Sequence, residues 1–556
     1  MLKKYCAAFL LAAVFGSQVY ADGTRAAIAS AHPLATAAGF EILAKGGNVF
    51  DAAVAVSATL AVVEPSGSGL GGGGYWLLHR EPDGFETMID GREQAPLAAH
   101  QAMFLDKSGK VIPRLSLDGG LAAAIPGLPA ALAHLSEKYG RLPLAESLQP
   151  AIRAAQSGFA LGEKHRKQLK FRAEAIKKYP QTAAIFLTDG DIPKAYSILR
   201  QADLAHTLKQ LANSGREGFY GGTIADKLVA GVNKAGGMWT KQDLASYRIV
   251  EREPVTGLYL GIKITSAAPS SSGGIVLIEA LNILSGYDLK EVNELTRKHL
   301  IAEALRRAYH DRALYLGDPD FITMPVKRLL NANYAAGLRS SLRPDKALPS
   351  ALLSGDIEPQ AEGVNTSHFS IIDQQGNRVA ATLSLNFPFG AGFVAPGTGV
   401  LLNDQMDDFA GQPGAMNGYG LIGGVANAIA PGKRMLSSMA PTFLDDGHNV
   451  AVLGTPGGSR IISMVLLAAL DFAQGYGPDS WVQVPRFHHQ FMPDVIEYEH
   501  GAISADERAG LAALGHQLKV TADVYGDMQA VQWHKTTHRL TAASDRRGEG
   551  RAVVAE

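Results

Sequence analysis

Residues 365–386, NTSHFSIIDQQGNRVAATLSLN, carry the clearest structural signal in this chain. Two runs of strand-favouring residues, 366–372 and 378–385, flank the polar segment 373–377, which is the pattern of a β-hairpin. The polar segment fits a three-residue loop, 374–376, with Gly376 in the left-handed conformation. Such a loop fixes the register of the two strands and predicts that Thr366 lies opposite Ser384.

This register brings two hydroxyl groups together. Side chains directly opposite each other in an antiparallel pair lie roughly 5 Å apart, so the hydroxyls of Thr366 and Ser384 can share a hydrogen bond. Taken alone, the pair has an ordinary explanation, because threonine is favoured in strands. The hairpin therefore leaves a structural and a catalytic interpretation open.

Before the hairpin, the chain alternates helical and strand patterns. Helical spacing occurs at 35–45, at 52–63 with Asp51 as its cap, and at 127–139, 144–156 and 295–315. Residues 349–365 have no period and combine proline, glycine and acidic residues, so we expect an exposed linker directly before the hairpin. No internal repeat of roughly 20 to 50 residues is present.

A glycine-rich turn, 454–458, lies after the hairpin, between an apolar strand at 451–453 and a helix expected over 459–472. Such a turn presents free N–H groups at a helix N-terminus, where negative charge is stabilised. It is either a plain connection or an oxyanion hole for a tetrahedral intermediate. The pattern favours neither interpretation.

The composition is that of a globular protein. The chain has 556 residues, 46% hydrophobic and 19% charged, with a net charge of −1, which argues against nucleic acid or an anionic membrane as the main partner. Its length suits about three domains or one large α/β sandwich. The only cysteine is Cys6.

The N-terminus has the pattern of a Sec signal peptide. Lys3 and Lys4 supply the charge, 5–15 is apolar but too short to span a bilayer, and 19–21, VYA, offers small residues at the cleavage-determining positions. We expect maturation after Ala21 and a periplasmic or secreted bacterial protein without a membrane anchor. Because Cys6 lies inside the signal, the mature chain can have no disulfide, no thiol nucleophile and no thiolate metal site.

Several common motifs are excluded. Residues 67–72 match GxGxxG but follow a helical pattern and lead into a strand at 75–79, the reverse of the order that a dinucleotide site needs, so we expect close backbone packing there. No GxSxG elbow, HExxH or GxxxxGK[ST] occurs. HH at 488–489 and DPD at 318–320 are weak metal candidates on spacing, and no metal site is predicted.

Seven motifs, in order along the chain, resemble the γ-glutamyltranspeptidase (glutathione hydrolase) family. They are DGRE at 90–93, NTSH at 365–368, SLN at 384–386, LLNDQMDDF at 401–409, LSSM at 436–439, PGGSR at 456–460 and PRFHH at 485–489. The similarity runs from about Gly23 to beyond residue 530, nearly the whole mature chain.

The resemblance implies an α/β fold, the four-layer αββα sandwich of the N-terminal nucleophile hydrolases, processed from a single precursor. The precursor is expected to cut itself between Asn365 and Thr366. After removal of the signal peptide, 1–21, the products are a large subunit, 22–365, and a small catalytic subunit, 366–556, which form a heterodimer. No cofactor is implied.

The resemblance also implies the catalytic residues. Thr366 is expected to be the nucleophile, because the α-amine freed by cleavage, with a pKa of ~7.7–8.0, can act as the base for its weakly nucleophilic hydroxyl. Ser384 would orient this hydroxyl. Gly457 and Gly458 would supply the oxyanion N–H groups.

The other matched residues suit a γ-glutamyl group, which carries one carboxylate and one ammonium at its far end. The implied ligands of the α-carboxylate are Arg92, Ser437 and Ser438, and those of the α-amine are Asp408, Asn386 and Gln405. Without the resemblance, Arg92 and Asp408 would be assigned to ordinary surface ion pairs, with neighbours such as Asp90 or Lys433.

Two further features of the sequence concern access to the site and the preference for acceptor or leaving group. The glycine-rich segment 411–431 resembles a mobile lid with Tyr419 as its gate, although a loose surface loop has the same composition. Asp404 stands where many relatives have asparagine, and 387–388, FP, stands where small hydroxyl residues are frequent. These departures concern the preference for acceptor or leaving group.

The sequence therefore predicts a γ-glutamyl hydrolase and transferase that works through a γ-glutamyl-Thr366 ester. Its donors would be glutathione and other γ-glutamyl compounds, and its acceptors water, amino acids or dipeptides. The alternatives are a glutaryl-type cephalosporin acylase, a polyglutamate-cleaving transpeptidase and an unprocessed, non-catalytic binding protein. Asp408 argues against the first, because an acyl group without an α-amine gains nothing from it.

Overall fold

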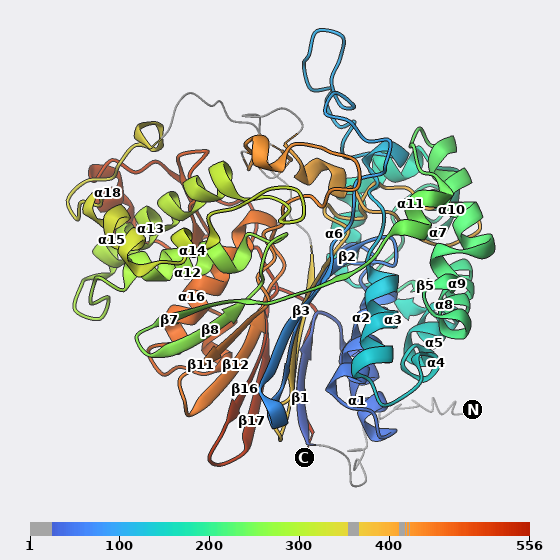
Figure 1. Cartoon of the computed structure of the whole chain (residues 1–556), viewed down its shortest axis with the longest axis horizontal. Helices are drawn as coiled ribbons and strands as arrows, with labels where there is room; N and C mark the ends of the chain where they lie inside the picture. The colour runs from blue at the N-terminus through green and yellow to red at the C-terminus, as the bar shows by residue number, and fades with distance from the viewer. Residues whose placement is uncertain (1–24, 354–365, 411–416, 419, 422, 556) are drawn as a thin grey trace, which may run out of the picture.

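The computed structural model describes residues 25–353, 366–410, 417–418, 420–421 and 423–555. Two antiparallel sheets lie face to face at its centre, and helices cover the outer face of each (Figure 1). The arrangement is the four-layer αββα sandwich that the sequence predicted. The signal peptide predicted at 1–21 lies outside the described residues.

The first sheet has seven strands, all paired antiparallel, and combines segments from before and after residue 366. From one edge to the other they are β18 (Arg551–Val554), β1 (Ala26–Ser30), β9 (Ser367–Asp373), β10 (Arg378–Ser384), β2 (Gly73–Arg80), β3 (Phe85–Gly91) and β6 (Val250–Arg252). The predicted hairpin is therefore the centre of this sheet.

The second sheet has six antiparallel strands. In order they are β17 (Arg539–Ser544), β16 (Gln529–His534), β12 (Asn449–Gly454), β11 (Thr442–Asp445), β8 (Ile262–Ser266) and β7 (Val255–Tyr259). Two small sheets lie apart from these, one of β13 (Phe487–His488), β14 (Ile496–Tyr498) and β15 (Leu518–Val520), the other of β4 (Phe159–Ala160) and β5 (Ile198–Leu199).

The register predicted for the hairpin is confirmed. Leu383 pairs with Ser367, and the Asp373 N–H donates to the Asn377 carbonyl at 3.0 Å, which leaves 374–376 as the three-residue loop. Gly376 has a φ of 94°, as that loop requires. Continued by one residue, this register places Thr366 opposite Ser384.

The alternation of side chains along each strand decides which way Thr366 and Ser384 point. On β9, Ile372 belongs to the core between the two sheets, whereas Phe369 and Ile371 belong to the core beneath the outer helices. Since successive strand residues point to opposite faces, Thr366 and Ser384 face the second sheet.

Helices from the first part of the chain cover the first sheet (Figure 1). They are α1 (Pro33–Ala44), α2 (Val49–Val63), α3 (Leu128–Tyr139), α4 (Leu144–Ser147), α5 (Gln149–Ser157), α6 (Glu163–Lys177), α7 (Pro180–Phe186), α8 (Ala202–Ser214), α9 (Glu217–Tyr220), α10 (Gly222–Lys234) and α11 (Lys241–Ser246). Helix α2 is buried along its whole length, since all fifteen of its residues are covered.

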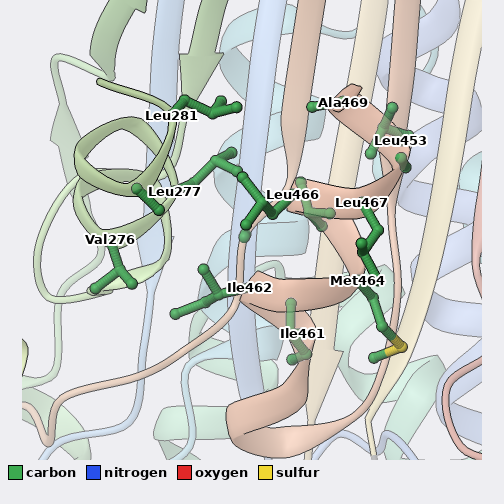
Figure 2. Packing of buried hydrophobic residues seen from close by; sticks show 14 of the residues in the cluster. Val276, Leu277, Leu281, Leu453, Ile461, Ile462, Met464, Leu466, Leu467 and Ala469 are labelled. Atoms are coloured by element: carbon green, nitrogen blue, oxygen red, sulfur yellow. The ribbon is translucent and has the colours of Figure 1, made fainter. Parts of the chain in front are cut away.

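The second sheet is covered by α12 (Gly273–Leu284), α13 (Glu294–Tyr315), α14 (Val326–Leu329), α15 (Ala332–Ser340), α16 (Ile461–Phe472), α17 (Pro478–Trp481) and α18 (Ala505–Ala513). Figure 2 shows Ile462 and Leu466 of α16 packed toward Leu277 of α12. No described helix combines the length and the apolar character needed to cross a membrane.

Three local predictions need correction. Helix α2 is capped by Asn48, and Asp51 is its third residue, whose carboxylate completes a capping box by accepting the Asn48 N–H at 2.9 Å. The helix predicted over 144–156 is two helices, α4 and α5, that meet at Leu148 before Pro150. The helix expected from Ser459 begins with a 3-10 turn, Gly458–Arg460.

The predicted linker is described only in part. Ala351 and Leu352 are exposed as expected, but Ser350 is fully buried, and its hydroxyl donates to the Phe491 carbonyl at 2.6 Å. Residues 354–365 of this segment lie outside the described residues.

The two sheets approach closely at Gly454, which generates a first prediction. A Cβ added there would lie 2.3 Å from His368, whose ring is held by Thr382 at 2.8 Å and Ser370 at 3.1 Å. Gly454→Ala is expected to lower stability by ~1–3 kcal/mol, measured as a lower midpoint of thermal unfolding. Gly337→Ala in α15, where nothing lies within 4 Å, should instead stabilise by ~0.5–1 kcal/mol. Equal midpoints for the two variants would contradict the close approach.

Candidate active site

One pocket gathers residues from distant parts of the chain. It is lined by Arg92, Arg312, Thr366, Ser384, Asn386, Gln405, Asp408, Leu421, Leu436, Ser437, Ser438, Met439, Gly458, Ser459 and Ile461. Of the predicted site residues that the structure describes, only Gly457, which directly precedes Gly458, does not line it. Tyr419 lies outside the described residues.

The two hydroxyls of the hairpin are at the buried end of β9 and β10. Thr366 is 4% exposed and Ser384 2%, and the Ser384 oxygen accepts the Asn386 N–H at 2.7 Å. This hydrogen bond holds the Ser384 side chain in place beside the pocket. The predicted hydroxyl pair therefore lines the same pocket as Arg92 and Asp408.

The glycine motif at 67–72 packs against this hairpin, as expected from its pattern. A Cβ at Gly67 would lie 3.0 Å from the Thr366 carbonyl oxygen, and one at Gly72 would lie 2.1 Å from that of Ser384. Any larger residue would displace the strand ends that carry both hydroxyls. Close backbone approach explains these glycines.

His368, two residues after Thr366 on the same face, is not a suitable base. Ser370 donates its hydroxyl to the Gln529 carbonyl at 3.0 Å, so it must accept from His368 Nε2–H, and Nδ1 then accepts from Thr382. Burial lowers the pKa of His368 to about 3. The imidazole is neutral and both of its nitrogens are engaged.

The glycine turn before α16 faces the pocket through Gly458. Gly457 and Gly458 have φ values of 146° and 57°, and within the described residues neither N–H donates a hydrogen bond to the protein. Behind the turn, the Tyr309 hydroxyl donates to the Ser459 carbonyl. The turn is thus fixed in position while its N–H groups stay available, which favours the oxyanion-hole interpretation.

Arg92 is fully buried and forms an ion pair inside the pocket. Its Nη2 lies 2.5 Å from Asp408 Oδ2, its Nη1 lies 3.5 Å from Glu93 Oε2, and its Nε donates to the Met435 carbonyl at 3.2 Å. Burial raises the pKa of Asp408 above its ordinary value, and Arg92 opposes that shift. The surface ion pairs considered for Arg92 and Asp408 are therefore excluded.

Gln405 and Asn386 also line the pocket, and Gln405 belongs to the same 3-10 turn as Asp408, Gln405–Asp408. Gln405 Oε1 is buried and accepts no hydrogen bond from the described residues. Asn386 Nδ2 donates to the Asp404 carbonyl at 3.0 Å, which directs its Oδ1 the other way. Asn386 also has a φ of 79°, a left-handed conformation that asparagine tolerates.

Ser437 and Ser438 line the pocket together with an arginine that no motif indicated. Arg312 lies in the last turn of α13, and its Nη2 donates to Ser438 Oγ at 3.3 Å. Sequence reasoning missed it because the pattern of 295–315 predicts a helix but not which of its arginines is buried. No motif in the sequence marks this position.

The carboxyl group of Asp404 contacts the backbone that follows Asn386. It is fully buried, its Oδ1 accepts the Phe387 N–H at 3.0 Å, and burial raises its pKa well above the ordinary value. Burial therefore disfavours a negative charge at this position.

The described part of segment 411–431 lies at the pocket. The Gly418 N–H donates to Asp407 Oδ2 at 2.8 Å, Asn417 Nδ2 lies 3.4 Å from Asp408 Oδ1, and Leu421 lines the pocket. The gate assigned to Tyr419 lies outside the described residues and stays a prediction.

The weak metal candidates have other partners. His488 Nδ1 lies 2.9 Å from Ser463 Oγ, and Asp318 Oδ2 accepts the Arg434 N–H at 2.7 Å. Across the described part of the chain, no group of three or more potential metal-ligating residues comes together.

The chain is similar over most of its length to known proteins. The family model for Gamma-glutamyltranspeptidase matches residues 35–555. The chain is 43% identical over 518 residues to the glutathione hydrolase proenzyme of Pseudomonas sp. (strain A14), covering 92% of this chain and 89% of that protein. It is 42% identical over 512 residues to that of Escherichia coli (strain K12), covering 91% and 87%. A solved cephalosporin acylase from Bacillus halodurans superposes with a TM-score of 0.84 at 28% identity, covering 96% of each chain.

Glu93 should make the stability of the protein depend on pH. It is fully buried beside Arg92, its Oε1 has no hydrogen-bond partner among the described residues, and burial raises its pKa to about 7 from 4.5. Because the folded state holds this proton more tightly than the unfolded state does, the group's contribution to stability falls as the pH rises from 4.5 to about 7. Glu93→Gln removes this loss. The unfolding midpoint of the variant relative to wild type should therefore rise between pH 5 and 8, and a constant difference would contradict the assignment.

Proposed function

The chain belongs to the gamma-glutamyltranspeptidase family, and on that premise we propose that Thr366 is its catalytic nucleophile. The protein is a γ-glutamyl hydrolase and transferase made as a self-processing proenzyme. We assign processing to the bond between Asn365 and Thr366, which divides the mature chain into subunits 22–365 and 366–556. The two subunits remain associated, because β9 and β10 lie between strands of the first part in one sheet.

One observation carries the assignment. A single pocket joins Thr366 and Ser384 to the buried pair of Arg92 and Asp408. A hydroxyl nucleophile therefore lies within reach of a ligand whose far end carries both a negative and a positive charge. The γ-glutamyl group is such a ligand.

Processing needs only groups of the chain and water. The Thr366 hydroxyl attacks the Asn365 carbonyl carbon, the peptide C–N bond breaks, and the acyl group moves to the hydroxyl oxygen as an ester while the nitrogen becomes a free amine. Water then hydrolyses this ester to the Asn365 carboxylate and restores the hydroxyl. The product is an N-terminal threonine whose amine is close to its own hydroxyl.

Turnover uses the same oxygen. The α-amine takes the hydroxyl proton as the oxygen attacks the γ-carbonyl, and the oxyanion accepts hydrogen bonds from the Gly457 and Gly458 N–H groups. The proton passes to the departing amine, which leaves a γ-glutamyl-Thr366 ester. Water or the amine of an amino acid or dipeptide then releases the glutamyl group. Neutral, fully engaged His368 supports the α-amine as the base.

Recognition of the donor follows from the charges of the pocket. Arg92, with the hydroxyls of Ser437 and Ser438, suits the α-carboxylate, and Asp408 suits the α-amine, assisted by Asn386 and Gln405. In the unliganded pocket Arg92 and Asp408 neutralise each other. A zwitterion offers each of them a partner of opposite charge, so binding leaves neither charge isolated.

The acylase alternative is disfavoured by the same pair. A glutaryl group has the carboxylate but no ammonium, so it would separate Arg92 from Asp408 and leave the aspartate unneutralised. The solved acylase is similar in fold over the whole chain, and the fold therefore does not discriminate between the two activities. The charge at residue 408 does.

The remaining parts of the proposal concern export of the protein and access to the pocket. We assign 1–21 to a signal peptide, the mature enzyme to the periplasm or medium, and Tyr419 to a gate above the bound glutamyl group. A non-catalytic, unprocessed protein would run as one band on a denaturing gel, whereas the enzyme would run as two.

The nucleophile is tested by Thr366→Ala, which should give a full-length, inactive chain because alanine has no oxygen for either reaction. Thr366→Ser should still be cut, more slowly, because it lacks the methyl group that restricts χ1. Ser367→Ala, which removes the neighbouring hydroxyl on the opposite face of β9, should be processed normally. Gel electrophoresis and N-terminal sequencing of the small fragment check all three. If Thr366→Ala were still cut before residue 366, self-processing by this hydroxyl would be wrong.

Donor selectivity is tested by Asp408→Asn, which keeps the shape but removes the charge assigned to the α-amine. Turnover of a γ-glutamyl anilide should drop, while that of the glutaryl anilide, which has no ammonium, should change little or rise. Asp407→Asn is the matched control, because its carboxylate binds Ser116 and Gly418 instead of Arg92. A ratio of activities that is the same in all three proteins would mean that the α-amine is held elsewhere.

A further inference from the structure

Arg312 is unlike the other buried arginines of this protein. Among the described residues nine arginines are buried, and eight of them form an ion pair with a carboxylate: Arg92, Arg172, Arg306, Arg307, Arg378, Arg434, Arg460 and Arg486. No carboxylate within the described chain pairs with Arg312, which is 4% exposed. Its charge is therefore not neutralised by an ion pair.

The contacts of Arg312 are to neutral groups. Its Nε donates to Ser272 Oγ at 2.9 Å and its Nη2 to Ser438 Oγ at 3.3 Å. Burial lowers the pKa of Arg312 to about 10, and Arg92 adds to this effect while Tyr309 and Asp408 oppose it. A buried cation without a counter-ion is costly, so its presence at a pocket wall indicates an anionic ligand.

Arg92 is in the opposite situation. It is already paired with the carboxylate of Asp408 at 2.5 Å, and the carboxyl group of Glu93 lies 3.5 Å away. An anion that enters the pocket meets Arg92 with much of its charge compensated, whereas the charge of Arg312 is still available. Electrostatics alone therefore favours a ligand position that both guanidinium groups can reach.

We propose that Arg312 is a second cationic ligand of the donor's α-carboxylate, acting beside Ser438. This inference rests on the proposed function, because it takes the γ-glutamyl group as the ligand of this pocket. The carboxylate then lies between two arginines, Arg92 at the end of β3 and Arg312 at the end of α13, and two hydroxyls from the small subunit. Both cations come from the large subunit.

A purely structural role for Arg312 makes a different prediction. Ser272, which accepts from Arg312 Nε, donates its own hydroxyl and its N–H to the Ser437 carbonyl at 2.7 and 2.8 Å. Arg312 could therefore act only by supporting the backbone of Ser437. Removing the Ser272 hydroxyl would then reproduce most of its effect on any donor.

The two roles are separated by two donors that differ in one group. γ-Glutamyl-p-nitroanilide carries the α-carboxylate, and 4-aminobutyryl-p-nitroanilide has the same amine and amide without it. With Arg312→Met, KM for the first should rise by at least ~10-fold with kcat within ~3-fold, and kcat/KM for the second should change by less than ~3-fold. Ser272→Ala should alter the ratio of kcat/KM between the two donors by less than ~3-fold.

Product inhibition gives a measure that does not depend on turnover. The inhibition constant of L-glutamate should rise by at least ~10-fold in Arg312→Met, while that of 4-aminobutyrate stays within ~3-fold. Arg312→Lys keeps a cation and should retain part of the preference for ligands that carry the α-carboxylate. It provides the same comparison if the methionine variant is not processed.

These measurements separate the role of Arg312 from the proposed recognition of the α-carboxylate itself. If Arg312→Met and Arg312→Lys lower kcat/KM equally for both donors, Arg312 is only a structural support and the inference is overturned. The same holds if Ser272→Ala reproduces the effect of the Arg312 variants. If Arg92→Ala changes the donor ratio and the Arg312 variants do not, the carboxylate site stands without Arg312. If wild type does not discriminate between the two donors, the proposed recognition of the α-carboxylate itself fails.

Discussion

The antiparallel register of β9 and β10 is the constraint on which the rest of this structure depends. Because strand side chains alternate between faces, a slip of one residue would turn Thr366 toward the outer helices and away from Gly458. The register is held by the three-residue loop at Gly376 and by Gly67 and Gly72, which lie against the two strand ends. The polar face of the hairpin, with neutral His368 beneath the nucleophile, then packs against Gly454 of the second sheet.

The second organising feature is the distribution of charge around the pocket. Arg92 and Asp408 are buried as a pair, so the cost of their desolvation is offset before a donor arrives. A ligand with one charge would break the pair, whereas a zwitterion replaces each partner. Arg312 changes this balance further, because it adds a positive charge to the pocket wall and no carboxylate among the described residues pairs with it.

Local rules predicted the parts of the fold that local sequence determines. The hairpin register followed from loop length and one glycine, and the close packing at 67–72 followed from element order. Where several residues compete, the rules failed: Asn48 and Asp51 both suit a cap, and only the backbone shows that Asn48 takes that position. The pairing of Arg92 with Asp408 and the isolation of Arg312 depend on burial and on contacts between residues far apart in sequence, which periodicity does not encode.

The central claim is that the Thr366 hydroxyl carries the γ-glutamyl group during turnover. Its most direct test is to quench the wild-type enzyme during reaction with a γ-glutamyl anilide and to map the small fragment by mass spectrometry. The account predicts one γ-glutamyl increment on the first residue of the peptide that begins TSHFS. An increment on another residue, or active protein in which the bond before Thr366 is intact, would contradict it.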